Sequence, residues 1–241
     1  MLRMYAKALS GEPVSVMSAE DLAGAAIVVV TAGVSQQPGE TRLDLLGRNV
    51  EVFREIAADL DRWAPEAVVI VATNPVDVMT WALRRLSARR ATRVVGTGTV
   101  LDSARLRALL GRRYGVDPQS VHGYVLGEHG DSMVPIWSSA TVGGLPLEKY
   151  PGWSINVANE LFNRTKTSGA EVIKKKGGAG FAVGLAIKEV IEAIALDRLE
   201  HGIGRVCKVS KEEIVGQVTS LMWWAEPRNT GSHFRPHERV C

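Results

Sequence analysis

The feature that most constrains the fold is a pattern that is repeated along the first hundred residues. Short runs of mostly β-branched residues end in turn residues. Each of the first two runs is followed by a segment that is long enough to form a helix. Runs that are apolar without alternation are typical of strands buried on both faces of a parallel sheet. The strands are expected at residues 23–30, 67–72 and 93–98, with helices at 43–63 and 76–86. The sequence therefore predicts an α/β fold with right-handed crossovers between parallel strands.

Small and polar residues follow directly after these three strands. They are Thr31-Ala32-Gly33, Thr73-Asn74 and Thr97-Gly98. Because ligands of open parallel sheets bind outside the carboxyl ends of the strands, we expect these residues to face one ligand site.

Beyond Asp102 the alternating pattern gives way to a different one. A helix is expected at residues 103–114, strands at 122–126 and 134–138, and long helices at 155–176 and 181–199. The two strands enclose the glycine-rich segment Gly127-Glu128-His129-Gly130-Asp131. This order of helices and strands predicts a second domain of mixed α+β type.

Composition narrows the possible functions. The 241 residues carry a net charge of only +3, which does not indicate nucleic-acid binding. No apolar run approaches the roughly 20 residues that span a bilayer, and residues 1–10 lack the apolar core of a signal peptide. Cys207 and Cys241 have neither disulfide nor zinc spacing. We expect a cytoplasmic protein without a metal site, a nucleic-acid partner or a membrane partner.

Four residues are candidates for chemistry. Asp102 and Arg105, three apart at the start of a helix, share one face. His129 lies between glycines that allow an exposed imidazole, and Arg42 ends the polar loop after the first strand. Each residue alone also has a structural explanation: Asp102 can cap its helix, Arg105 can be a solvated charge, and His129 can be a hydrogen-bonded surface residue. The functional interpretation depends on their joint occurrence.

Five motifs occur together in a fixed order, and they resemble those of the L-lactate and malate dehydrogenase family. The motifs are Thr31-Ala32-Gly33, Gln36-Gln37-Pro38-Gly39-Glu40-Thr41-Arg42, Thr73-Asn74-Pro75-Val76-Asp77, Leu101-Asp102-Ser103-Ala104-Arg105 and Gly127-Glu128-His129-Gly130-Asp131-Ser132. The likeness is strongest to the bacterial NAD-dependent L-lactate dehydrogenases, and it extends from about Pro13 to Glu200. It implies an oxidoreductase that interconverts pyruvate and (S)-lactate in glycolysis and carboxylic acid metabolism.

The resemblance also implies a role for each candidate. His129 would be the acid and base, since imidazole exchanges protons near neutral pH. Asp102 would orient the imidazole and favour its charged form. Arg105 would clamp the substrate carboxylate with its planar guanidinium. Arg42, on a loop that closes over the substrate, would stabilise developing charge, and Asn74 would bind near the carbonyl. The NAD site would comprise Thr31, Ala32, Gly33, Val34, Ala72, Thr73, Asn74 and Thr97.

Two further positions bear on the substrate. In the resembled family, an arginine at the position of Gln36 would pair with the second carboxylate of oxaloacetate, so glutamine favours pyruvate. Ala179 stands where lactate enzymes of the family usually carry threonine, and a smaller side chain admits bulkier 2-oxo acids. A malate-type or other 2-hydroxy acid dehydrogenase is therefore the alternative.

The resemblance further implies a homo-oligomer, either a dimer or a tetramer. Arg107 and His122 match positions that form a subunit-interface site for fructose 1,6-bisphosphate in bacterial members. Both also have structural explanations, as an arginine in a basic helix and a histidine at the start of a strand. Allosteric regulation therefore stays an open alternative.

The sequence departs from the family pattern at both ends. No G-x-G-x-x-G fingerprint occurs before Ala23, although this turn and its helix normally hold the cofactor's pyrophosphate. We therefore expect an incomplete Rossmann-like sheet in residues 1–98, a partial α+β substrate domain in 99–201 and an atypical tail in 202–241. A truncated or frame-altered product would give this pattern, and a catalytically inactive remnant of the family is the third alternative.

Overall fold

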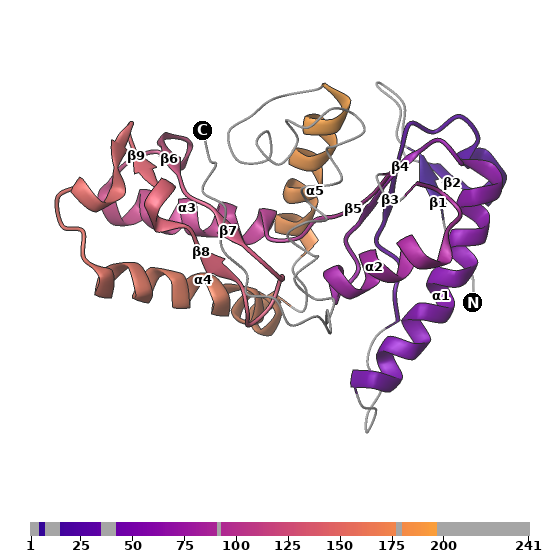
Figure 1. The fold of residues 1–241 in the computed structure, drawn as a ribbon, viewed down its shortest axis with the longest axis horizontal. Coiled ribbons are helices and arrows are strands. Elements are labelled where there is room, and N and C mark those ends of the chain that lie inside the picture. Colours follow the sequence, from indigo (N-terminus) through magenta and orange to yellow (C-terminus); the bar gives the residue numbers. More distant parts are fainter. Residues whose placement is uncertain (1–4, 8–14, 35–41, 91–92, 177–179, 197–241) are drawn as a thin grey trace, which may run out of the picture.

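The structure is a computed structural model. It describes residues 5–7, 15–34, 42–90, 93–176 and 180–196. Figure 1 shows two bodies side by side along the longest axis. The first half of the chain forms one body around a parallel sheet, and the second half forms the other around helices α3 and α4. Gln36, Ala179 and the predicted tail at 202–241 lie outside the described residues.

The parallel sheet predicted from the sequence is confirmed. Its strands β3 (Ile27–Val30), β4 (Val68–Val71) and β5 (Val94–Gly96) lie in the order β3-β4-β5, with Val29 opposite Ile70 and Ile70 opposite Val95. Strand β3 begins later than residue 23, because a short 3₁₀ helix, η1 (Ala19–Leu22), and a turn at Gly24 (φ 76°) precede it. Strands β1 (Tyr5–Lys7) and β2 (Ser15–Met17), not predicted from the sequence, form a separate antiparallel pair.

Two helices connect the three strands and pack on the sheet. Helix α1 (Arg42–Trp63) joins β3 to β4, and α2 (Val76–Leu86) joins β4 to β5, which matches the predicted segments. Successive crossovers in one direction put both helices on the same face of the sheet. Their apolar sides meet the strands in one cluster whose fully buried members include Phe53, Leu60, Met79, Leu83, Val69 and Val71. This core fixes the sheet edge at which the strands end.

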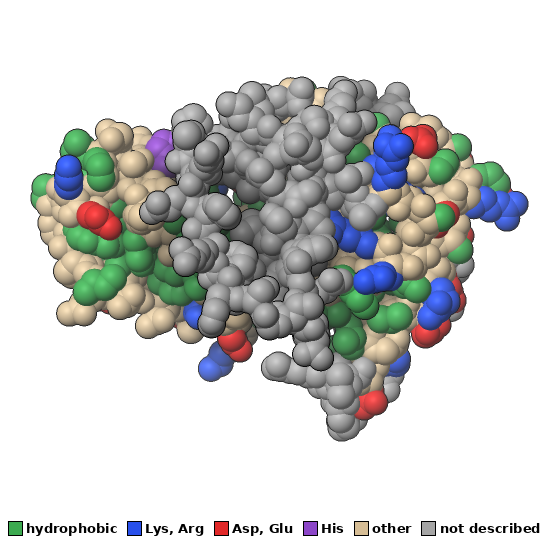
Figure 2. Space-filling view, in the orientation of Figure 1, with side chains coloured by type: hydrophobic (Ala, Val, Ile, Leu, Met, Phe, Trp, Pro, Cys, Tyr) green, Lys and Arg blue, Asp and Glu red, His purple; other side chains and the backbone are tan. Residues whose placement is uncertain are grey.

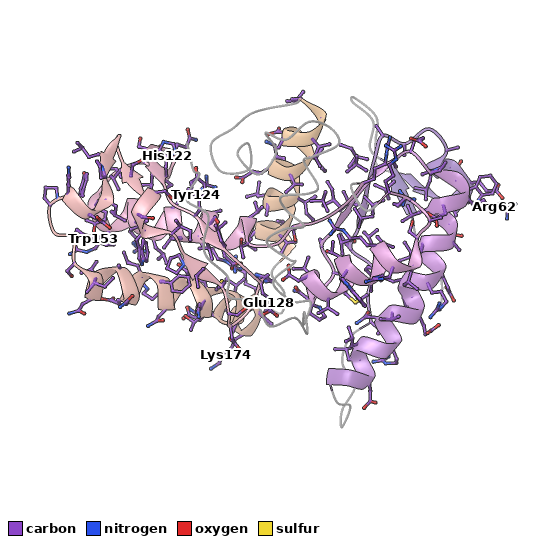
Figure 3. The ribbon with its side chains drawn as sticks, in the orientation of Figure 1. Arg62, His122, Tyr124, Glu128, Trp153 and Lys174 are labelled. Carbon is purple, nitrogen blue, oxygen red and sulfur yellow. The ribbon has the colours of Figure 1, made fainter. Side chains whose placement is uncertain are left out.

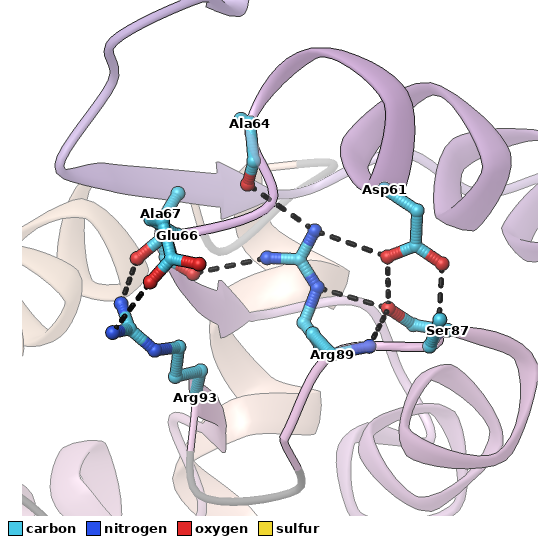
Figure 4. A network of polar contacts seen from close by, with 8 residues as sticks. Asp61, Ala64, Glu66, Ala67, Ser87, Arg89 and Arg93 are labelled. Carbon is cyan, nitrogen blue, oxygen red and sulfur yellow. Dashed lines mark hydrogen bonds and ion pairs between the residues drawn. The ribbon is translucent and has the colours of Figure 1, made fainter.

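A polar network closes the opposite edge of the sheet, where β4 and β5 begin (Figure 4). The Arg89 side chain is 1% exposed. Its guanidinium donates to Ser87 Oγ (2.9 Å), the Ala67 carbonyl (2.9 Å), the Ala64 carbonyl (3.4 Å) and Asp61 Oδ1 (3.4 Å). Burial lowers the pKa of Arg89 and its ion pair with Asp61 raises it. Arg89 thus ties the end of α1 to the segment between α2 and β5.

The second half starts with helix α3 (Val100–Tyr114), which begins three residues earlier than predicted. Helices α4 (Ile155–Lys176) and α5 (Gly180–Ala195) follow later in the chain, and both contact α3. Leu106 and Leu110 of α3 are fully buried in a second core with Val121, Val125, Met133, Ala140, Val142, Leu147, Leu161 and Phe162. The two cores share no residue.

Two predicted strands of this half are wrong in detail. The strand expected at 122–126 is divided into β6 (Val121–His122) and β7 (Val125–Leu126), which join different sheets. The break falls at Gly123, whose backbone packs against Leu110 and Leu106 of α3. The strand expected at 134–138 is only β8 (Val134–Pro135), because Trp137–Ser139 forms the 3₁₀ helix η4.

Short elements complete this half of the fold. The 3₁₀ helices η3 (Pro118–Ser120) and η5 (Leu147–Lys149) flank the small sheet. Strands β9 (Thr141–Val142) and β10 (Leu145–Pro146) form a hairpin that pairs with β6 and was not predicted. Gly143 and Gly144 form its turn with φ values of 57° and 83°, which is the conformation that tight hairpins require.

The described surface carries charges of both signs. On the face drawn in Figure 2, Lys and Arg side chains lie mainly over the first half, with Asp and Glu side chains interspersed. Within the described ranges, none of the helices combines the length and apolar character needed to cross a membrane. The same residues include no group of three His, Cys, Asp or Glu side chains that could hold a metal ion.

Candidate active site

The carboxyl ends of the three parallel strands meet at one edge, as the sequence predicted. The Ala72 amide donates to the Val30 carbonyl (2.9 Å) and the Thr97 amide to the Val71 carbonyl (2.9 Å), so the ladder continues past the strands. Thr73 is buried and its hydroxyl donates to the Ala32 carbonyl (2.6 Å). Asn74 and the segment 31–33 are exposed at this edge. The predicted cofactor-binding residues are therefore brought together.

The segment after β3 runs close to its neighbours at this edge. A Cβ on Gly33 would lie 2.9 Å from Thr73 Cγ2 and 3.1 Å from Asn49 Oδ1, so only glycine lets the segment pass this close to its neighbours. Asn49, buried on α1, accepts a hydrogen bond from the Val34 amide (2.8 Å). The segment is thus held with exposed backbone and small side chains, a surface on which a flat ring and its ribose can lie. Asn49 was missed in the sequence, where its signal is a polar residue on an otherwise apolar helix face.

Asp102 and His129 form a tight pair in the second half. The distance between Asp102 Oδ2 and His129 Nδ1 is 2.5 Å, and the Asp102 side chain is only 2% exposed, whereas that of His129 is 29% exposed. Because a carboxylate only accepts hydrogen bonds, Nδ1 carries the proton and Nε2 is left for a substrate. Asp102 lies inside the first turn of α3 after the N-cap residue Thr99, so the alternative that Asp102 caps its helix is wrong.

The surroundings of His129 favour its protonated form. The hydrogen bond with Asp102 raises the pKa of His129 above its ordinary value, and the charges of Asp102 and Asp77 act in the same direction. Burial of the imidazole and the charge of Arg105 lower the pKa, but the net direction is upward. Because its pKa is raised, the imidazole of His129 is protonated near neutral pH and can donate this proton.

Arg105 lies beside this pair, on the same face of α3. Its Nη1 atom is 3.3 Å from Asp102 Oδ1, and its side chain is 15% exposed. The guanidinium packs over Gly169 of α4, where an added Cβ would lie 3.4 Å from Nη1. Asp102 therefore bonds the imidazole with one oxygen and the guanidinium with the other.

Hydrogen bonds around β7 aim the loop that carries His129. The Val125 amide donates to Ser103 Oγ (2.9 Å), and the Thr99 hydroxyl donates to the Val125 carbonyl (2.6 Å). Both partners belong to the start of α3, next to Asp102. Gly127, with φ 93°, then turns the chain into the loop, so α3 and the loop are held together as one unit.

A further residue reaches His129 from the first half. Asp77, in the first turn of α2, accepts a hydrogen bond from the His129 amide through Oδ2 (2.7 Å). In Figure 3, the neighbouring Glu128 lies between the two bodies. Asp77 belongs to the motif Thr73-Asn74-Pro75-Val76-Asp77, but the sequence alone indicated no role for it. Its only signal there was an acidic residue just after Asn74-Pro75 at a helix start.

For three of the other predicted residues, the structure does not describe the side chain. Arg42 is the first residue of α1, but the structure describes only its backbone. Gln36 and Ala179 lie outside the described residues. Arg107 lies on α3 and pairs with Glu189 of α5 (3.7 Å). His122 lies on β6, at the outer side of the second half in Figure 3.

Comparisons with known proteins point to one family. Residues 5–96 match the NAD binding domain of the lactate/malate dehydrogenase family, and residues 99–225 match its alpha/beta C-terminal domain. These matches run beyond the range from Pro13 to Glu200 over which the motifs suggested the likeness. An L-lactate dehydrogenase from Salinibacter ruber is 52% identical over 182 residues, which are 73% of this chain and 58% of that protein.

Solved structures of the same class are also similar. The minor L-lactate dehydrogenase from Enterococcus mundtii, with ligands bound, matches with a TM-score of 0.71 and 39% identity, covering 74% of this chain and 58% of that one. The malate dehydrogenase from Picrophilus torridus matches with a TM-score of 0.70 and 34% identity, covering 76% and 56%. The fold, with its parallel-sheet half and its mixed second half, is that of the lactate and malate dehydrogenases. The chain belongs to the lactate/malate dehydrogenase family, and it spans less than two thirds of the length of these relatives.

Proposed function

We propose that this chain carries the catalytic centre of an NAD-dependent L-lactate dehydrogenase, which interconverts pyruvate and (S)-lactate. The observation that carries the proposal is the cluster in which Asp102 bonds His129 Nδ1 at 2.5 Å and Arg105 at 3.3 Å. A proton donor and a carboxylate-binding cation, joined by one buried acid, are the groups that reduction of a 2-oxo acid requires.

His129 is the acid in reduction and the base in oxidation. The proton on Nε2 passes to the substrate oxygen as the carbonyl becomes a hydroxyl, and in the reverse direction Nε2 takes it back. Asp102 keeps the proton on Nδ1 throughout and stabilises the imidazolium, which gives Nε2 a fixed orientation. The Asp102 side chain is almost fully buried, so water does not compete for this bond.

Arg105 binds the carboxylate of the substrate. Its guanidinium offers five donors in a plane, of which one is engaged by Asp102. The guanidinium lies against Gly169 of α4, where an added Cβ would be 3.4 Å from Nη1. Arg42 is proposed to stabilise charge on the substrate oxygen, with Gln36, Asn74 and Ala179 lining the rest of the substrate site.

The cofactor is proposed to lie at the sheet edge next to this cluster. The residues that would hold its nicotinamide end are Thr31, Ala32, Gly33, Val34, Ala72, Thr73, Asn74 and Thr97. The bound nicotinamide supplies or accepts the hydride, while the chain supplies the proton and the binding groups. The match of residues 5–96 to an NAD binding domain supports this assignment.

Several finer features follow from the family as proposals. We propose a cytoplasmic homo-oligomer, a dimer or a tetramer, with a place in glycolysis. A regulatory anion site at Arg107 and His122 would have to compete with Glu189, which pairs with Arg107 at 3.7 Å. A malate-type activity is the second candidate, and the similarity to the Picrophilus torridus enzyme supports keeping it in the test.

The test is NADH oxidation by the purified chain, with pyruvate and oxaloacetate offered separately. We expect turnover with pyruvate, little with oxaloacetate, and a loss of turnover of about 100-fold or more in H129Q. R105K, which keeps the charge but not the planar fork, should mainly raise KM for pyruvate. Preference for oxaloacetate would transfer the assignment to the malate type. Failure of the wild-type chain to bind NADH would refute the proposal for this chain.

A further inference from the structure

The imidazole of His129 is not the only part of this residue that a carboxylate holds. Asp102 bonds its side chain from α3, and Asp77 bonds its backbone amide from α2, at 2.7 Å. The two acids come from different bodies of the fold, since α2 packs on the first core and α3 on the second. His129 is therefore fixed from both sides of the boundary between them.

We propose that Asp77 is a positioning residue for His129, which ties the His129 loop to the first body and places a negative charge beside the imidazole. The inference rests on the proposed function, because it deepens the role of the same site. It goes beyond that function because it links the two bodies directly. The first body, which carries the proposed cofactor site, binds the backbone of the proton donor in the second body.

The local geometry favours this role over a purely helical one. An acid in the first turn of a helix ordinarily stabilises that helix by interacting with its free amides. Asp77 does bond its own amide, but Oδ2 also accepts from the His129 amide, 52 residues further along the chain. Burial raises the pKa of Asp77 above its ordinary value, while the hydrogen bond from the His129 amide opposes this shift by favouring the carboxylate. The bond to the His129 amide is thus one of the interactions that offset the burial of the carboxylate.

The charges that face His129 come from three elements. Asp102 and Arg105 belong to α3, Asp77 belongs to α2, and Glu128 belongs to the loop itself. Both aspartates favour the imidazolium, while Arg105 opposes it. Removal of the charge of Asp77 should therefore make His129 a stronger acid, independently of any loss of packing.

The experiment compares D77N and D77A with a matched control, D117N, in the full chain. Asp117 also accepts a hydrogen bond from a backbone amide, that of Gln119 (2.8 Å), but it is exposed and is the N-cap residue of η3. In D77N the amide oxygen can still accept from the His129 amide while the charge is absent. D77A removes both the bond and the charge.

The first readout is the titration of the His129 imidazole, followed by nitrogen–proton correlation spectra and assigned with H129Q. We expect the midpoint to be lower in D77N than in the wild type and in D117N, with the thermal unfolding midpoint of D77N close to that of D117N. Identical His129 midpoints in D77N, D117N and the wild type would overturn the proposal. This readout needs no turnover, so an inactive wild-type chain would refute the proposed function and leave this test intact.

The second readout is the split between kcat and KM for pyruvate. We expect kcat of D77A to fall by up to about 100-fold, since a small misplacement of a catalytic group has an effect of this size. KM should change less, because Arg105 is not touched, and D77N should recover part of kcat because the tether remains. A D77A chain with the kcat and pH profile of the wild type would contradict the positioning role.

Discussion

At the scale of single residues, the site is governed by one buried acid. Asp102 has two oxygens and two cationic or proton-bearing partners, His129 at 2.5 Å and Arg105 at 3.3 Å. A buried carboxylate with both oxygens engaged does not need water, which is why its side chain tolerates an exposure of only 2%. The acid therefore sets both the proton affinity of His129 and the direction of its ring.

The first prediction concerns D102N and the pH dependence of pyruvate reduction. Reduction needs the imidazolium, so activity is present below the pKa of His129 and is lost as pH rises through it. Since the bond with Asp102 raises this pKa, D102N should move the fall in kcat/KM to lower pH. The amide should also reduce the maximum by about 100-fold or more, because it no longer stabilises the charged ring.

The check is a profile of kcat/KM against pH for the wild type and D102N. D117N is the control, since Asp117 bonds only the Gln119 amide of its own segment. A falling limb that stays at the same pH in D102N would show that another group titrates there.

The sequence identified most of this cluster but not all of it. His129, Asp102 and Arg105 lie in short motifs whose spacing is visible in one dimension. Asp77 and Asn49 act through backbone amides of segments 52 and 15 residues away, and nothing in their own neighbourhoods indicates those partners. A hydrogen bond between a side chain and a remote amide leaves no pattern in the sequence, so these residues appear only once the fold is known.

At the scale of elements, the long helices were easier to predict than the short strands. Helices α2 and α4 begin and end where their apolar spacing predicted, because a helix of three turns or more repeats its pattern several times. The segment 122–126 has too few residues for any periodicity, and packing of Gly123 against α3 decided where it breaks. The β9–β10 hairpin was missed although Gly143-Gly144 is a typical turn signal.

The second prediction concerns the Arg89 network that joins α1, α2 and β4. R89A would remove the guanidinium that donates to Asp61, Ser87 and the Ala64 and Ala67 carbonyls, so we expect the free energy of unfolding to fall by about 2 kcal/mol. R90A is the control, because the Arg90 side chain is exposed and such substitutions change stability by about 0.5 kcal/mol or less.

Urea unfolding followed by circular dichroism measures both differences. Equal stabilities of R89A and R90A would mean that the guanidinium of Arg89 only compensates the cost of its own burial. The network lies at the edge of the sheet opposite to the proposed site, so R89A should leave the titration of His129 unchanged.

At the scale of the whole molecule, the described residues form two hydrophobic cores that meet at one boundary. No residue belongs to both hydrophobic clusters, and the Asp77–His129 bond crosses from one body to the other. Structural units of this kind commonly open separately, each with its own free energy.

The third prediction compares L60A, in the first core, with L110A, in the second. Both side chains are almost completely buried, so each substitution should destabilise its own body by about 3 kcal/mol. Amide hydrogen exchange should become faster in β3, β4 and β5 for L60A, and in α3, β6 and β9 for L110A. If both variants accelerated exchange equally in the two bodies, the described fold would be one cooperative unit.

The hydrogen bond from the backbone amide of residue 129 to Asp77 does not depend on the side chain that residue 129 carries. Every amino acid except proline supplies the same donor, so the loop stays fastened whether or not an imidazole projects from it. Arg105 also keeps its place over Gly169 without reference to residue 129. Under the proposed function, a descendant of this chain that exchanged His129 for an inert side chain would lose proton transfer and keep its hold on a small carboxylate. The architecture therefore offers a short evolutionary route from the proposed enzyme to a receptor.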